Sequence, residues 1–428
     1  MVKSLRIHGP VLLGLAVLVF AAFGRLTSTP LFDNLDAQII RDAHQLAVNP
    51  ANMFNHIGFY FSQPLLQLAF LAEYRLFGLN TAGYLAVNLA VHTVNSFIVY
   101  MLVNMLFPRH RMAVLAATLF ALAVGSYGRV FMTIHQLEGL LIAGLHLLVL
   151  YFFIRNDFRR HGGVRSPLFL IGLGLFLLAG LTKAASFSLV GCLIAYKLFF
   201  ITQRSRRTVF SPDILVFVAV ALAFHFAQSH WGFQAPTVYE SASGHTYFSL
   251  LSVKNLFRYL VLMFFPMQQS PILESAPAWV VWVYHARMVI RFLLTLAILS
   301  YSFFGFVFGS RSIRFFIAWT YITLVPFTGH TDTGVWLNLS HLYLTSLGFC
   351  VILAAGATGT SNLLARHPWR RLVPYLVPLC FAVISVSVAW KLDGRNKWVA
   401  SGPDAAALRQ DVVRSCQARP ALIRDIRR

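Results

Sequence analysis

The chain has 428 residues, of which 58% are hydrophobic and 11% are charged, and its formal net charge is +21. A soluble domain of this length cannot bury so large an apolar fraction in one core, so the composition excludes an ordinary soluble protein. Much of the positive charge falls in short loops between apolar runs, without aromatic residues interleaved on a polar face. We therefore expect no nucleic acid as a partner.

Apolar runs long enough to cross a lipid bilayer as helices recur along nearly the whole chain. We predict an all-α polytopic membrane protein with about 11 transmembrane helices, within a range of roughly 10–13. In chain order, the predicted spans are residues 10–27, 84–107, 112–127, 137–154, 167–183, 186–202, 209–227, 284–308, 315–329, 341–358 and 372–390.

The basic connections between these spans all fall on one side of the membrane, which the positive-inside rule assigns to the cytoplasm. The N-terminus is then cytoplasmic and is expected to serve as a retained signal anchor. This topology divides the chain into a transmembrane module, residues 1–390, and a short extracytoplasmic C-terminal tail, residues 391–428. The two large outer loops are residues 28–83 and 228–283.

Two further apolar segments, residues 64–78 and 250–266, are predicted to lie as helices in the outer interface and not to span the bilayer. The first is short and carries Glu73. The second carries Lys254 and Arg258, which are four residues apart and therefore share one face of a helix.

Carboxylates cluster directly after the first span, where Asp33, Asp36 and Asp42 lie within one loop. Asp33 and Asp36 are three residues apart, so they share a face if the segment is helical. Asp33 could instead cap the helix predicted for DAQIIRDAHQL. Partial burial beside lipid raises the pKa of a carboxyl group, which suits a general base.

Residues 62–103, SQPLLQLAFLAEYRLFGLNTAGYLAVNLAVHTVNSFIVYMLV, resemble a signature of GT-C-fold membrane glycosyltransferases, closest to the O-mannosyltransferase-like proteins. VKNLFRYLVLMFFPMQQSP (253–271) and LYLTSLGFCVILA (342–354) resemble later segments of that family, in the same order. The tetratricopeptide repeats that many of these proteins carry are not found here. The polar positions that match along the second span are Asn88, His92 and Asn95.

The resemblance implies a GT-C-like fold and a polyprenyl-phosphate-sugar-dependent glycosyltransferase. Such an enzyme moves a sugar from a polyprenyl-phosphate donor to an acceptor hydroxyl. The transferred group is expected to be a hexosyl or pentosyl unit, and the displacement is expected to invert the anomeric centre. The acceptor is expected to be a Ser or Thr of a secreted or surface protein, such as a pilin-type subunit, or an envelope glycan. The expected location is the bacterial cytoplasmic (inner) membrane, with the active site facing the periplasm.

In that family the first outer loop begins with an acidic pair, one member of which is proposed as the catalytic base. The resemblance therefore makes Asp33 and Asp36 the catalytic candidates, because an attacking hydroxyl must lose its proton to a positioned base. Glu138, at the start of a predicted span, is the candidate for a second carboxylate. Capping of the helix N-terminus is the alternative role for Glu138.

Negative charge grows on the departing phosphate, so cations or hydrogen-bond donors are expected around it. The phosphate-binding candidates are Lys183, Lys254, Arg258, Arg129 and His135. Lys183 lies in Thr182-Lys183-Ala184, where the family has Ser-Lys-Glu. For Arg129 and His135 the alternative role is anchoring at the membrane interface, and for Lys254 and Arg258 it is binding of anionic lipid head groups.

Asn88, His92 and Asn95 form a polar stripe along one predicted span. A buried stripe of this kind is expected to form hydrogen bonds between membrane helices rather than to act as a proton relay.

No metal-ligand set is visible, and the four cysteines lack the pair spacing of a zinc site or a disulfide framework. A divalent cation, Mg²⁺ or Mn²⁺, stays open as a cofactor because some relatives use one. Two other functions also stay open, namely a lipid or glycan transporter or flippase, and a catalytically inactive GT-C relative. The sequence shows no clear inverted repeats, which favours the enzyme over the transporter.

Overall fold

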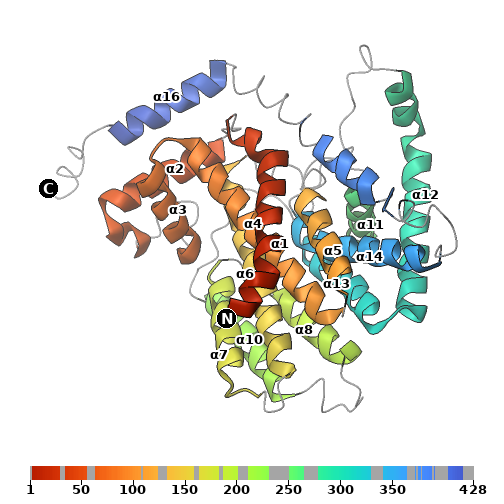
Figure 1. Ribbon diagram of the computed structural model, residues 1–428. Helices are drawn as coiled ribbons and strands as arrows, with labels where there is room; N and C mark the ends of the chain where they lie inside the picture. The colour runs from red at the N-terminus through yellow and green to blue at the C-terminus, as the bar shows by residue number, and fades with distance from the viewer. Residues whose placement is uncertain are drawn as a thin grey trace.

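The computed structural model describes residues 2–28, 34–54, 63–107, 109–123, 133–158, 163–182, 187–200, 211–230, 250–264, 278–328, 341–363, 378–387 and 403–417, together with positions 372, 375–376 and 390. Every regular element in these ranges is a helix, and no strand occurs among them (Figure 1).

The elements follow one another along the chain as a series of mostly long helices. They are α1 (Val2–Phe23), η1 (Gly24–Ser28), α2 (Asn34–Val48), η2 (Pro50–Phe54), α3 (Pro64–Phe77), α4 (Thr81–Leu106), α5 (His110–Leu122), η4 (Ile134–Gln136), α6 (Leu137–Asp157), α7 (Pro167–Gly180), α8 (Phe187–Phe200), α10 (Pro212–His230), α11 (Leu250–Phe264), α12 (Ala278–Phe308), α13 (Arg311–Thr328), α14 (Leu342–Leu363) and α16 (Pro403–Gln417). A further apolar helix covers Pro378–Ser387.

Each predicted span overlaps one of these helices. Among the described residues, five segments are both long enough and apolar enough to cross a membrane, namely His8–Thr27, Thr81–Leu106, Ile134–Asp157, Met288–Phe308 and Leu342–Ser361. The predicted all-α membrane architecture is confirmed, while the number of crossings stays a prediction. The two segments assigned to the interface are helices as well, α3 and α11.

The helix bundle is packed around α4, which contacts α1, α5 and α6, and around α14, which contacts α13 and α5. Small residues let these helices approach closely, as is typical within membranes. A Cβ atom at Gly144 of α6 would lie 2.5 Å from Asn95 Oδ1 of α4. At Gly348 of α14 it would lie 2.2 Å from Thr320 Oγ1 of α13, so neither position has room for a larger residue.

The polar stripe of α4 forms hydrogen bonds between helices, which confirms the role predicted for it. His92 Nε2 lies 3.0 Å from the Ala121 carbonyl oxygen, to which it donates, so Nδ1 accepts from the Tyr343 hydroxyl at 2.7 Å. Asn95 donates to the same hydroxyl oxygen at 3.2 Å and to the Leu140 carbonyl at 2.9 Å. These bonds fix α4 against α5, α6 and α14.

A second, smaller apolar core, which we call the head, lies at one end of the bundle (Figure 1). Local signals define its helices: Pro64 begins α3, Gly78 ends it with φ of 57°, and Asn80 caps α4 by accepting from the Ala82 N–H. The buried residues of the head come from α2, α3, α4, η4, α6 and α16. They are Ala37, Ile39, Ile40, Ala43, Leu66, Phe70, Tyr84, Ile134, Leu137 and Val412.

The last described part of the chain returns to the end of the bundle where α1 finishes. Trp390 Nε1 donates to the Ala22 carbonyl at 2.7 Å, and the Arg25 guanidinium stacks on the Trp390 ring at 4.0 Å. α16 then packs on α2. Residues 34–48 and 403–417 therefore lie at the same end of the molecule.

At the end of α6 and α8, a buried cation joins three helices. Lys197 Nζ lies 2.7 Å from Asp157 Oδ1 and 2.8 Å from Asp213 Oδ2 at the start of α10. The shared cation balances the charge of the two carboxylates and connects the ends of α6, α8 and α10.

Candidate active site

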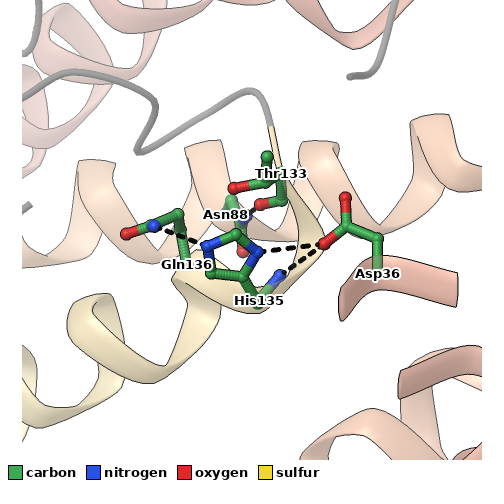
Figure 2. A network of polar contacts seen from close by, with 5 residues as sticks. All are labelled: Asp36, Asn88, Thr133, His135 and Gln136. Atoms are coloured by element: carbon green, nitrogen blue, oxygen red, sulfur yellow. Dashed lines mark hydrogen bonds and ion pairs between the residues drawn. The ribbon is translucent and has the colours of Figure 1, made fainter. Parts of the chain in front are cut away.

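Asp36 lies in the first turn of α2, and its side chain is fully buried. Two donors from one residue converge on it: the His135 backbone N–H at 3.1 Å and the His135 ring Nδ1 at 3.2 Å, both directed at Oδ1 (Figure 2). Because both contacts use the same oxygen, they fix the orientation of the carboxylate and do not use Oδ2.

Gln136 determines the proton arrangement of the His135 ring. Its amide nitrogen Nε2 lies 2.8 Å from His135 Nε2, on the opposite side of the ring from Asp36 (Figure 2). With the amide as donor, Nε2 of the imidazole accepts, so the ring proton is on Nδ1 and is donated to Asp36. In this arrangement the Nδ1–H of His135 is the donor that faces the Asp36 carboxylate.

The segment that carries His135 is anchored to α4. Asn88 Nδ2 donates to the Thr133 carbonyl at 3.2 Å, and both side chains are buried. Asn88 Oδ1 and Thr133 Oγ1 have no hydrogen-bond partner among the described residues. Since a buried polar atom without a partner is costly, these two atoms provide hydrogen-bonding capacity for a ligand or water beside the Asp36–His135 pair.

The structure brings together only some of the residues predicted from the sequence. Asp36 and His135 are in contact. Glu138 is half-buried in the first turn of α6, one turn after His135, where a carboxylate is also stabilised by the helix N-terminus. Asp33, Arg129 and Lys183 lie outside the described residues.

Lys254 and Arg258 lie on α11, which packs on α12, α13 and α14. Lys254 is exposed and Arg258 is half-buried. Asn255 donates to the Thr328 carbonyl at 3.1 Å. These contacts hold the basic face of α11 beside the end of α13.

His341 contacts α11, and this contact was not predicted from the sequence. Its Nδ1 lies 3.2 Å from the Tyr259 hydroxyl, and its ring stacks on Phe327 with centroids 4.1 Å apart. It precedes α14, whose Tyr343 binds the α4 stripe. The only sequence signal was its position just before LYLTSLG, because the contact with α11 joins distant parts of the chain.

Glu73 of α3 is a second buried carboxylate, which sequence reasoning placed at the interface. It faces the head core, and neither of its carboxyl oxygens has a hydrogen-bond partner among the described residues. Burial raises the pKa of Glu73 to about 8. The group is therefore predominantly protonated at neutral pH, so it is unsuited to be the base in this state.

The described residues do not form a complete metal site. No group of three or more His, Cys, Asp or Glu side chains suited to a metal ion occurs among them. In the Asp36–His135 pair, both ring nitrogens already contact protein groups. We therefore derive no step through a metal ion.

No protein-family model and no curated protein matches the chain at the level of sequence. In three dimensions it is similar to the oligosaccharyltransferase AglB of Archaeoglobus fulgidus. The apo crystal structure gives a TM-score of 0.53 at 15% identity, over 91% of this chain and 56% of AglB. The structure with a tethered acceptor peptide containing the NVT sequon gives 0.50 at 15% identity, over 91% and 55%.

The complex of AglB with an inhibitory peptide and a dolichol-phosphate gives a TM-score of 0.51 at 14% identity, over 91% of this chain and 56% of AglB. The chain thus spans little more than half the length of these proteins. Agreement over 91% of the chain at such low identity demonstrates a shared fold. The GT-C-like fold expected from the sequence is therefore confirmed.

Proposed function

We propose that this protein is a membrane glycosyltransferase that moves a sugar from a polyprenyl-phosphate donor to an acceptor hydroxyl. The observation that carries the proposal is the buried Asp36 carboxylate, oriented by His135 at one end of a GT-C-like helix bundle. AglB, which has the same fold, has been solved with a dolichol-phosphate, and this supports a lipid-phosphate donor here.

In the proposed reaction the acceptor oxygen attacks the anomeric carbon of the donor sugar. Oδ2 of Asp36 takes the hydroxyl proton as the new carbon–oxygen bond forms. The bond between the anomeric carbon and the phosphate oxygen breaks, and its electron pair leaves with the polyprenyl phosphate. Attack from the face opposite the leaving group inverts the anomeric centre.

His135 acts in this scheme by positioning the base. Its Nδ1–H and backbone N–H hold Oδ1, so Oδ2 is presented in one orientation, which lowers the entropic cost of proton transfer. We therefore assign His135 to the base rather than to the phosphate. Asp33 and Glu138 remain as further carboxylate candidates.

For the departing phosphate we propose Lys183, Arg129 and the α11 pair Lys254 and Arg258. The exposed and half-buried positions of the pair suit a head group that approaches from the membrane interface. Positive charge there stabilises the negative charge that grows on the leaving oxygen.

The finer assignments are part of the same proposal. The transferred group is a hexosyl or pentosyl unit, and the acceptor is a Ser or Thr of a secreted or surface protein or a hydroxyl of an envelope glycan. The enzyme lies in a bacterial inner membrane with residues 28–83 and 391–428 in the periplasm. The basic connections between spans support this orientation.

The test is sugar transfer from purified polyprenyl-phosphate sugars by the full chain in nanodiscs. Asp36→Asn keeps the shape of the side chain but removes the base, so turnover should fall by about 100-fold or more. Asp42→Asn is the matched control, because Asp42 lies on the same helix and is bound by Gln38 at 2.7 Å.

Transfer that depends on the donor and is lost only in Asp36→Asn would support the proposal. Near-normal turnover of Asp36→Asn would contradict the assignment of the base. Movement of the lipid-linked sugar across the bilayer without any transfer would instead favour a flippase.

A further inference from the structure

The C-terminal helix α16 is an integral part of the head. Val412 is only 2% exposed and belongs to the buried head core with residues of α2, α3 and η4. Leu408 and Cys416 pack against the same core. These three residues recur every four positions, so they form one apolar face of α16 that is covered by the head.

Polar contacts reinforce this docking. Arg41 of α2 forms an ion pair with Asp411 of α16, although the two residues are 370 positions apart. Cys416 forms a side-chain hydrogen bond with Tyr74 of α3, whose hydroxyl lies 2.8 Å from His44 Nδ1 of α2. α16 is thereby connected to both α2 and α3.

α2 is consequently held from two sides. Through Asp36 it contacts His135 of η4, and through Arg41 and its apolar face it contacts α16. Figure 1 shows α16 lying along α2 at the end of the molecule, away from the bundle. A shift of α2 would move Asp36 relative to His135, because both contacts depend on the same helix.

We propose that α16 is a strap that positions α2, and through it Asp36, for the transfer reaction. This inference rests on the proposed function for its catalytic part, whereas the docking of α16 is independent of it. Val412 is the main positioning residue, because it is the buried member of the docked face. Arg41 and Asp411 set the register of the strap from the solvent side.

Docking can be measured without any activity through the native Cys416. In a Cys380→Ser background, the remaining cysteines Cys192 and Cys350 are buried, so a polar maleimide reports on Cys416. Val412→Asp places a charge in the head core and should detach α16. Ala407→Asp introduces the same charge at an exposed position of α16 and serves as the control.

The expected result is that Val412→Asp raises the labelling rate of Cys416 by about tenfold or more. It should also lower kcat for transfer by about tenfold or more with little change in the KM for the donor, since a displaced reacting group costs on the order of 10- to 100-fold in rate. Ala407→Asp should leave labelling and transfer unchanged.

Exchanging the charges of Arg41 and Asp411 provides a rescue experiment for docking and transfer. Arg41→Asp and Asp411→Arg each place like charges together, so each should raise labelling and lower kcat, and the double variant should restore both. Recovery in the double variant excludes a general folding defect.

Three outcomes contradict the proposal in distinguishable ways. Unchanged labelling of Cys416 in Val412→Asp would show that α16 is not docked through this face. Faster labelling with unchanged kcat would show that α16 docks without positioning Asp36, and the proposed function would stand. No transfer by the wild-type chain would contradict the proposed function and the catalytic part of the inference, whereas docking would still be decided by labelling.

Discussion

Asp36 and His135 are 99 positions apart in the sequence, yet the His135 ring Nδ1 lies 3.2 Å from Asp36 Oδ1. The His135 backbone N–H binds the same oxygen at 3.1 Å. The start of α2 and the segment before α6 therefore meet at one point, and Asn88 of α4 holds the second segment by donating to the Thr133 carbonyl. This convergence connects the helix bundle to the proposed base.

Replacing His135 should separate the effect of its ring from that of its backbone. His135→Ala keeps the N–H contact but removes the ring, so Asp36 loses one of the two bonds that His135 donates to it. We expect kcat for transfer to fall by about 10- to 100-fold. Gln136→Ala leaves the Asp36–His135 contact in place and should cost less. Transfer kinetics of purified variants decide this, and equal kcat values for His135→Ala and wild type would refute the positioning role.

Glu73 predicts a pH dependence for the stability of the head. Burial raises its pKa in the folded state from the ordinary 4.5 of an exposed glutamate to about 8, so the folded head favours the protonated acid. The resulting stabilisation is complete below about pH 4.5 and is lost as the pH rises through about 8. At about 1.4 kcal/mol per pKa unit, the total effect is on the order of a few kcal/mol.

Limited proteolysis between about pH 5 and pH 9, the titration window of Glu73, would follow this loss, with the variants compared at each pH. The accessibility of the wild-type protein relative to Glu73→Gln should rise with pH, because the glutamine cannot ionise. Asp42→Asn should retain the wild-type dependence. An equally steep profile for Glu73→Gln would show that another group causes it.

The close packing of α13 against α14 leads to a prediction about thermal stability. At Gly348 a Cβ atom would lie 2.4 Å from the Phe316 carbonyl oxygen, so Gly348→Ala forces the two helices apart. We expect a loss of about 1–3 kcal/mol in stability, typical of overpacking. Gly359→Ala is the matched control on the same helix, because nothing lies within 4 Å of its Cβ position. Thermal unfolding in nanodiscs would show a lower Tm for Gly348→Ala alone; equal Tm values would mean that the helices can separate without cost.

The sequence predicts the helices better than the contacts between them. Apolar runs locate the spans, and each overlaps a helix, because the membrane requires continuous apolar stretches with internal backbone hydrogen bonds. The role of the α4 stripe also follows from its spacing, since polar side chains in a membrane helix need partners on neighbouring helices.

The candidate site was less predictable, because its geometry depends on tertiary contacts. Asp36 and His135 were both candidates, but their pairing joins α2 and η4, which are far apart in the sequence, and leaves no local pattern. Val412 shows the same limit: the four-residue spacing of Leu408, Val412 and Cys416 indicates an apolar helix face, whereas its docking on α2 needs the folded structure. Glu73 lies on the helix predicted at the interface, and its burial in the head depends on α3 turning the face of Leu66 and Phe70 inward, which no local pattern shows.

The last prediction concerns the orientation of the head in the membrane. α2 and α16 are in contact, so Gln45→Cys on α2 and Ala407→Cys on α16 must be labelled from the same side. Both positions are exposed. The basic connections between spans predict that this side is the periplasm. In a variant without Cys380 and Cys416, an impermeant maleimide should therefore label both introduced cysteines in intact cells. Arg165→Cys, in a basic connection on the opposite side, should be labelled only after the membrane is permeabilised. Labelling of Arg165→Cys alone in intact cells would reverse the orientation and place the proposed base in the cytoplasm, where a periplasmic acceptor could not reach it.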